Sequence, residues 1–364
     1  MILKDITSYL ESLAPLSSQE SYDNSGLIVG DPNAQITQAL ICLDSTEEVV
    51  EEAIQNGCNL IIAHHPIVFK GLKSLTGKNY VERVVLKCIK NDIALYAIHT
   101  NLDNYRFGVN FEIGKRLGLE NLKILEPKKN VLHKVSVFVP VESKDTVAKA
   151  MFEAGAGFIG DYKNCSFSTE GIGSFFPLEG AQPTIGSVEH QEEVKEVLLE
   201  MLVSNHELSI VVAAMKASHP YEVVAYDLIA LSNSNEYEGA GMIGQLADSM
   251  NVVDFLSLVK RQFNCGIIRH TKIVKDKVKT IAFCGGSGSF LLNNAIRSKA
   301  DVYITGDFKY HEFFDSEDKI LIADIGHFES EQYTINLLCD VLMKKFPNFA
   351  IRLTKINTNP INYF

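Results

Sequence analysis

Between Thr37 and Gly118, short apolar runs alternate with stretches of helical spacing, an order that few folds accommodate. The apolar runs predict strands over residues 38–44 (QALICLD), 58–64 (CNLIIAH) and 93–99 (IALYAIH). The intervening stretches predict helices over residues 45–57, 79–92 and 108–118, the first of them with Ser45 or Thr46 as N-cap and Gly57 at its C-terminus. Alternating strands and helices are typical of a mainly parallel sheet covered by helices, so the predicted class is α/β.

The same order returns near the C-terminus. Strands are predicted over residues 278–284, 301–307 and 319–327, and the turn GGSGS follows the first of them. Residues 327–346 predict one long amphipathic helix. The two ends of the chain therefore look like halves of one two-lobed α/β body.

The middle of the chain interrupts this order. Residues 133–157 predict a strand and then a helix, residues 216–231 predict a helical turn and a strand, and the Asn-, Ser- and Gly-rich residues 231–244 predict a loop. A unit of roughly 100 residues is a normal domain size. We expect an α+β domain over 128–237, inserted into a body made of 1–127 and 238–364.

Composition excludes several classes of protein. The 364 residues carry a formal charge of −11, which disfavours broad contact with nucleic acid or an anionic membrane. The short basic run from Lys272 to Lys279 contains an acid and favours a solvated face. The seven cysteines are scattered and form no CxxC pair, which argues against a disulfide framework and against a thiolate zinc site. No signal peptide or membrane span is indicated, so a cytoplasmic location is expected.

Histidines and carboxylates occur at four predicted strand ends. They are His64 and His65, His99 and Asp103, Asp307 and His311, and His327 and Glu331. Ligands of open parallel sheets bind at the carboxyl ends of the strands, where distant segments converge. The last pair stands four residues apart at a predicted helix start, on one helix face.

Imidazole and carboxylate groups together suit zinc, manganese, iron or cobalt. Because successive strand residues point in different directions, two adjacent histidines suit two neighbouring ions better than one. A structural alternative stands for each residue alone: a lone histidine is more often hydrogen-bonded in the fold, and an acid near a helix start often only complements the helix dipole. The coincidence of all these groups favours a metal site.

Two smaller signals accompany the site. The loop 284–290 (CGGSGSF) could offer backbone N–H groups to an anion, or it could be a tight turn without a ligand. Asp23 and Asn24, before Gly26, are typical of an ordinary turn.

Six segments carry a family resemblance. YDNSGLIVG, IIAHHPIVF, AIHTNLDN, GGSGS, TGDFKYHE and GHFESE, in this order, resemble the dinuclear-metal-centre hexameric proteins called Nif-three-like, which often bear the name GTP cyclohydrolase 1 type 2 homologue. The resemblance covers residues 1–127 and 238–364. It implies two divalent ions (Zn, Mn, Fe or Co), one held by His64 and His327, the other by His65 and Asp103, with Glu331 bridging both.

The resemblance also implies an assembly and an insertion type. The family forms a toroidal homohexamer, a trimer of dimers, and the middle segment is similar to a PII or CutA-type α+β unit, with SHPYEVVAYD (218–227) as its clearest signature. His219 in this segment is a conceivable metal ligand, although His-Pro-Tyr-Glu is more typical of a fixed turn.

Two functions follow from the resemblance. In the first, a metal-dependent hydrolase adds water to C8 of the guanine of GTP, the ring opens and formate leaves; His99 or His311 would shuttle protons, and Lys70 or the GGSGS loop would meet the triphosphate. In the second, the assembly is not catalytic and handles metal or regulates a partner. Both imply a small-molecule or metal partner, and neither implies a membrane or nucleic acid.

Overall fold

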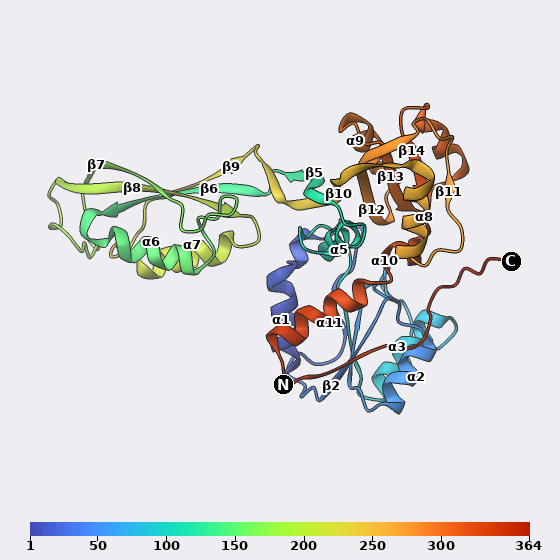
Figure 1. Cartoon of the computed structure of the whole chain (residues 1–364). Coiled ribbons are helices and arrows are strands. Elements are labelled where there is room, and N and C mark those ends of the chain that lie inside the picture. Colours follow the sequence, from blue (N-terminus) through green and yellow to red (C-terminus); the bar gives the residue numbers. More distant parts are fainter. The chain divides into compact units, whose positions relative to one another are not determined.

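The computed structural model describes all residues from Met1 to Phe364. The chain forms two compact units: the body, which comprises Met1–Pro127 and Tyr237–Phe364, and the inserted unit, Lys128–Glu236 (Figure 1). The predicted α/β class is confirmed. None of the helices combines the length and the apolar character that crossing a bilayer requires.

The first sheet of the body has five strands in the order β1-β4-β3-β2-β15. Strands β2, β3, β4 and β15 are parallel to their neighbours, and β1 pairs with β4 in the antiparallel sense. The strands span Gly26–Val29 (β1), Gln38–Cys42 (β2), Leu60–Ala63 (β3), Ala94–Ala97 (β4) and Ala350–Leu353 (β15). The helical segments of this half span Leu3–Leu13 (α1), Leu16–Ser18 (η1), Glu47–Gln55 (α2), Tyr80–Lys90 (α3) and Thr100–Asp103 (α4).

The second sheet has six strands in the order β11-β14-β13-β12-β10-β5. Its central strands β12, β13 and β14 are parallel, and β10 and β11 are antiparallel to their partners. The strands span Glu120–Lys129 (β5), Ser234–Asn251 (β10), Arg269–His270 (β11), Lys277–Ser287 (β12), Val302–Gly306 (β13) and Leu321–Asp324 (β14). The helical segments span Val109–Arg116 (α5), Val252–Gln262 (α8), Ser289–Leu291 (η3), Leu292–Arg297 (α9), Tyr310–Ser316 (η4), His327–Glu331 (α10) and Thr334–Lys345 (α11).

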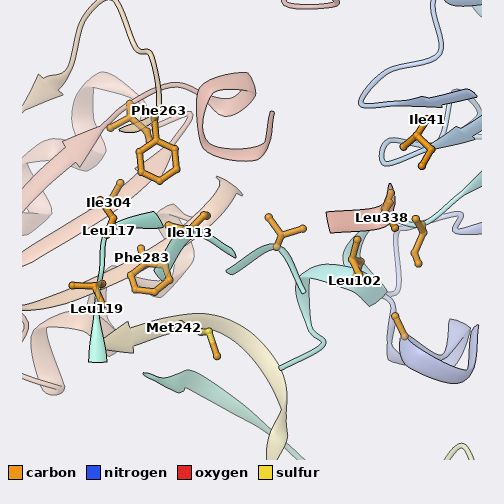
Figure 2. Close-up of a cluster of buried hydrophobic side chains, with 14 of the residues drawn as sticks. Ile41, Leu102, Ile113, Leu117, Leu119, Met242, Phe263, Phe283, Ile304 and Leu338 are labelled. Carbon is orange, nitrogen blue, oxygen red and sulfur yellow. The ribbon is translucent and has the colours of Figure 1, made fainter. Parts of the chain in front are cut away.

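One hydrophobic core joins the two sheets. It contains Ile41 of the first sheet, Phe283 and Ile304 of the second, Ile113 of α5 and Leu117 directly after that helix. Figure 2 shows Ile113 beside Phe283. Strands β3 and β4 are buried along their whole length and β2 from Ala39 onward, which is why these segments are continuous apolar runs. The strand ends of both sheets can therefore meet within one body.

The inserted unit is a four-stranded antiparallel sheet in the order β7-β8-β6-β9. Helices α6 and α7 lie together on one face of this sheet (Figure 1). This βαββαβ arrangement is the ferredoxin-like split motif. The elements span Leu132–Pro140 (β6), Val141–Ser143 (η2), Lys144–Glu153 (α6), Phe167–Phe175 (β7), Glu192–Ser204 (β8), Leu208–Ser218 (α7) and Tyr226–Leu231 (β9).

Three local predictions were wrong. The helix expected over 327–346 is two helices, because the chain turns at Gln332 and Tyr333 between α10 and α11. The loop expected over 231–244 largely belongs to β10, since pairing within the second sheet, between β5 and β12, overrides its Asn-, Ser- and Gly-rich composition. The GGSGS turn begins inside a strand, as β12 continues to Ser287.

Candidate metal centre

The two adjacent histidines directly follow strand β3. The backbone N–H of His64 donates to Cys42 O at 3.1 Å. The N–H of His65 donates to Leu43 O at 2.9 Å, so both residues extend the pairing with β2. Their rings lie 4.9 Å apart at 44°. Each ring consequently has its own set of neighbours.

His64 is fully buried at the base of the site. Its Nδ1–H donates to Ile98 O at 2.8 Å, which leaves the lone pair on Nε2. This Nε2 lies 3.6 Å from Asp103 Oδ1 and 3.8 Å from Glu331 Oε2. Neither His64 Nε2 nor Asp103 Oδ1 has a hydrogen-bond partner, although both atoms are buried. Unpartnered buried polar atoms are rare, and here they face each other.

His65 is held by a carboxylate behind it. Its Nδ1 hydrogen-bonds to Asp44 Oδ1 at 2.7 Å, and its Nε2 lies 3.0 Å from Glu331 Oε2. Asp44 in turn accepts a hydrogen bond of 2.7 Å from Thr358 Oγ1 through its other oxygen. Burial alone would lower the pKa of His65, but the hydrogen bonds to Asp44 and Glu331 raise it to about 10.

His327 and Glu331 stand on the short helix α10. The His327 Nε2 lies 3.1 Å from Glu331 Oε2, as expected for residues four apart, and its Nδ1 hydrogen-bonds to Asp307 Oδ2 at 2.7 Å. Burial would lower the pKa of His327, yet the charge of Glu331 and the Asp307 hydrogen bond raise it to about 11. The pKa of the Glu331 carboxyl, although raised by burial, is held well below its usual range by these imidazoles.

Two glycines make room for this helix. Gly286 has φ +62°, and a Cβ there would lie 2.3 Å from Glu331 Oε1. A Cβ on Gly306 would lie 2.7 Å from His327 N. Only glycine fits at these strand ends, because the ligand-bearing helix packs against the bare backbone.

Asp103 completes the cluster from helix α4. Burial and the charge of Glu331 raise the pKa of its carboxyl to about 7. The shortest distances place Asp103 beside His64, and His65 beside His327, whose Nε2 atoms are 3.3 Å apart. The resemblance implies the other pairing of these four residues. In either pairing, Glu331 Oε2 lies 3.0 Å from His65 Nε2, 3.1 Å from His327 Nε2 and 3.8 Å from His64 Nε2.

The residues present fit a metal ion. Because every Nδ1–H donates to a group outside the cluster, the three Nε2 atoms of the neutral imidazoles and the two carboxylates would all be acceptors, so the cluster needs positive charge at its centre, from protons or from a metal ion. Ligands about 2.1 Å from a tetrahedral ion lie about 3.4 Å apart, close to the separations found here. The possible ligand atoms of His64, His65 and Glu331 all lie within 4.8 Å of one another. This group could hold a divalent ion.

A cavity of about 650 Å³ opens over the cluster. His65, Asp103, His327 and Glu331 line it. Aromatic side chains form much of its wall: Tyr22, Phe69, Tyr80, Phe290 and Phe328. No lysine or arginine lines it.

His99 lies in the wall of this cavity and is 9% exposed. Its Nδ1 hydrogen-bonds to Asp23 Oδ1 at 2.8 Å, and Asp23 Oδ2 accepts from the N–H of Thr100 at 3.0 Å. Burial raises the pKa of the Asp23 carboxyl, but the hydrogen bonds from His99 and Thr100 outweigh it and lower that pKa. Asp23 therefore stays charged and orients His99.

Other predicted residues lie away from the cluster. His311 is exposed and contacts Tyr310 and Phe314, and neither it nor Lys70 lines the cavity. His219 belongs to the inserted unit, where its ring bonds the backbone on both sides. Asp307 contributes as the partner of His327 Nδ1.

The GGSGS loop has internal partners. The N–H of Gly285 donates to Asn110 Oδ1 at 3.0 Å, and that of Gly286 donates to Ser330 Oγ at 2.9 Å. These two donors are not available to an anion. The loop instead provides space for Glu331.

Sequence reasoning missed two carboxylates. Asp44 ends the apolar run 38–44, at a strand end like the other candidates, and that position could have identified it. Asp23 gave no such signal, because its importance comes from a contact with His99, 76 residues away.

Comparison with known proteins identifies relatives that match the chain over its whole length. It is 36% identical over 368 residues to a Staphylococcus aureus protein named GTP cyclohydrolase 1 type 2 homolog, and the match covers 100% of both chains. A Staphylococcus epidermidis protein of the same name is also 36% identical over 100% of both chains. The crystal structure of a Bacillus cereus protein related to NIF3 superposes with a TM-score of 0.87 at 38% identity, covering 100% of this chain and 99% of that one.

The sequence also matches the family described as Duf34/NIF3 (NGG1p interacting factor 3) over residues 1–360. Nearly the whole chain, including the segments that carry the five clustered residues, lies within this match. The chain therefore belongs to the Duf34/NIF3 family.

Proposed function

We propose that this protein is a dinuclear metal-dependent hydrolase acting on a small molecule with a planar ring. The observation that carries the proposal is the convergence of three oriented imidazole Nε2 atoms and two carboxylates at the base of one cavity. His64, His65, Asp103, His327 and Glu331 would hold the ions, with Glu331 between them because its Oε2 is near all three imidazoles.

The ions would supply Lewis acidity and lower the pKa of water towards neutrality. The chain's own residues set the conditions for that chemistry. Asp44 and Asp307 fix the orientation of His65 and His327, and burial of His64 excludes bulk water from the base of the site. These positions make the donor set rigid before any ligand arrives.

His99 is the proposed proton carrier. Asp23 occupies its Nδ1, so Nε2 is the atom that can exchange a proton with a molecule in the cavity. The neighbouring Phe69 ring, 5.8 Å from the His99 ring between centroids, adds an apolar surface on which a flat substrate can lie.

The cavity wall bears on the choice of substrate. A guanine-like ring suits its aromatic side chains, and the relatives' name suggests GTP. A triphosphate, however, would find no lysine or arginine in the lining, and its charge would have to be met by the ions alone. This favours a substrate with less negative charge than GTP.

The experiment is metal analysis of protein purified without chelator, followed by assays of formate and phosphate release from GTP and of hydrolysis of other ring-containing substrates. Glu331→Gln and Asp103→Asn should lose both metal and turnover. His99→Gln should keep the metal and lose turnover. His311→Asn, an exposed histidine outside the cavity, is the matched control and should retain both. Full turnover in Glu331→Gln would contradict the proposal.

The acidic lining without cationic side chains also favours a second candidate, a non-catalytic metal-handling or regulatory assembly. Ions that exchange readily, with no turnover on a broad substrate panel, would support it over the hydrolase. Anomalous diffraction at the metal absorption edge would identify the ions and show which histidine pairs with Asp103.

The resemblance further supports a cytoplasmic homohexamer with a PII- or CutA-type inserted unit. The ferredoxin-like topology of that unit is compatible with this type. Light scattering coupled to gel filtration should give about six times the chain mass of 40.4 kDa. A monomeric mass at micromolar concentration would exclude the hexamer.

A further inference from the structure

The inserted unit contains a cavity of its own, on the sheet face opposite to its helices. Residues of β6 and β8 alternate in direction: Val137 and Leu199 pack in the core with α6 and α7, so Phe138 and Glu196 lie on the other face. The segment 176–185, from the β7–β8 connection, lines the same space. The cavity is open to solvent on one side and has a volume of about 400 Å³, within the range of small-molecule sites.

The connection is attached to the turn that follows α7. Thr184 Oγ1 donates to Pro220 O at 2.7 Å, and the Gln182 N–H donates to Glu222 Oε1 at 3.1 Å. These bonds join two segments that are 36 and 40 residues apart in sequence. The cavity is therefore built by the fold and is more than a gap beside a loop.

Glu196 is the notable group in this cavity. It is only 8% exposed, and Tyr221 Oη donates to its Oε1 at 2.9 Å. Across β7, a Cβ on Gly173 would lie 2.1 Å from its Oε2, so glycine is what leaves space for the carboxylate. No lysine, arginine or histidine lines the cavity.

The His-Pro-Tyr-Glu turn holds Tyr221 in place. The His219 Nε2–H donates to Phe138 O at 2.9 Å, and its Nδ1 accepts from the Tyr221 N–H at 3.1 Å. The Tyr221 ring lies edge-on to His219 and to Phe175, with centroids 5.1 Å and 6.1 Å away. This explains the motif that the metal centre did not use: it positions the phenol against Glu196.

A buried carboxylate with a single neutral donor is costly unless a cation or further donors reach it. The remaining walls are mainly aromatic or apolar, with Phe138, Phe175, Phe176 and Val223 among them, and the second acid, Glu222, adds to the negative charge. We propose that this cavity is a binding site for a small organic cation, an apolar or aromatic body that carries an amidinium or ammonium group directed at Glu196.

The test uses three probes of equal shape and different charge: benzamidine, benzamide and benzoate. Binding to the full-length, metal-loaded protein is measured by saturation-transfer NMR and calorimetry. Benzamidine should bind, benzamide should bind more weakly, and benzoate should not bind. Glu196→Gln should weaken benzamidine about tenfold or more and leave benzamide nearly unchanged.

Glu200→Gln is the matched control. Glu200 lies on the same strand and the same face, but Lys134 already pairs with it at 2.9 Å, so benzamidine binding should persist. Glu331→Gln should also bind benzamidine normally, which excludes the metal centre as the site. Ala225→Leu fills the cavity while it keeps the carboxylate, and it should abolish binding even where Glu196→Gln folds poorly.

Three results would overturn the proposal: no benzamidine binding to the native protein at millimolar concentration, unchanged binding in Ala225→Leu, or benzoate binding as strong as that of benzamidine.

Discussion

At the scale of single residues, the candidate metal centre depends on atoms behind the ligands as much as on the ligands. Each histidine of the cluster gives its Nδ1 to a carbonyl or carboxylate and directs Nε2 inward. The raised pKa values of His65 and His327 show what this arrangement requires, because protons or a metal ion must provide the positive charge.

Metal uptake should therefore release protons. In chelator-treated protein, His65 and His327, with pKa values of about 10 and 11, stay protonated at neutral pH, so a divalent ion must displace those protons. Apparent affinity should rise with pH from 6 to 9, by up to about tenfold per unit for each proton displaced. Calorimetry of zinc binding in buffers of different ionisation enthalpy measures the protons released. A buffer-independent enthalpy would show that none is displaced.

Thr358 should tune the site through Asp44. Its hydroxyl donates to Oδ2 of Asp44, and the other carboxylate oxygen of Asp44, Oδ1, hydrogen-bonds to His65 Nδ1. Thr358→Val should weaken metal affinity about tenfold, in line with losses of outer-sphere partners elsewhere. Thr358→Ser keeps the hydroxyl and serves as the control. Competition with a fluorescent chelator gives the affinities, and equal values for both variants would argue against the relay.

Glu207, away from the metal centre, makes the stability of the protein depend on pH. Burial raises the pKa of its carboxyl to about 7 from an ordinary value of 4.5, so its contribution to stability is complete below pH 4.5 and is lost as pH rises through 7. Glu207→Gln should increase the free energy of unfolding at pH 8.5 by on the order of 1–2 kcal/mol, seen as a higher unfolding temperature. At pH 5 the free energy of unfolding should change little. Exposed Glu153→Gln is the control; a stabilisation that is equal at both pH values would contradict this assignment.

At the scale of elements, the site exists because strand ends of two sheets face each other. Strand β3 supplies His64 and His65, β4 leads to His99 and Asp103, and α10 after β14 supplies His327 and Glu331. The glycines at the ends of β12 and β13 let α10 approach. Their role is thus steric.

Gly286→Ala should weaken metal binding, an effect beyond the loss of stability that the left-handed backbone conformation alone would cause. The new Cβ would lie 2.3 Å from Glu331 Oε1 and would displace the carboxylate. Gly57→Ala is the matched control, since it has φ +69° with no atom within 4 Å of the added Cβ. Both should lose about 1 kcal/mol of stability to the left-handed backbone, and only Gly286→Ala should also lose metal affinity. Chemical denaturation and chelator competition measure the two effects.

The sequence predicted the elements that are buried on both faces and the ligands that follow them. Strands β2, β3 and β4 are continuous apolar runs, and the histidines at their ends were found by position. Strand β7 was not found, because most of its side chains are exposed and its pattern carries no periodic signal. Asp23 and the break at Gln332 depend on contacts between distant segments, which local patterns do not record.

At the scale of the whole molecule, two nested units share one chain. The inserted unit leaves the body from β5 and returns through β10, and these two strands are neighbours in the second sheet. Each unit has its own hydrophobic cluster. The body should therefore fold without the insertion.

Replacing residues 130–233 by a short Gly-Ser linker should leave the body folded with its metal affinity within about twofold of the full chain, because loop closure between adjacent strands costs little. Circular dichroism and metal titration test this. Matched deletion of α8, which packs in the body core through Phe255 and Val259, should abolish folding. Loss of metal binding in the linker variant would show that the two units depend on each other.

The separation of the ligands along the chain has a consequence for biosynthesis. His65 and Glu331 are 266 residues apart, and the whole inserted unit is translated between them. At about 5–20 residues per second, His64 and His65 leave the ribosome tens of seconds before Glu331 is synthesised. During that interval the nascent chain has only part of a chelating site, so metal loading must follow the completion of both sheets, and a prematurely terminated chain would hold metal poorly.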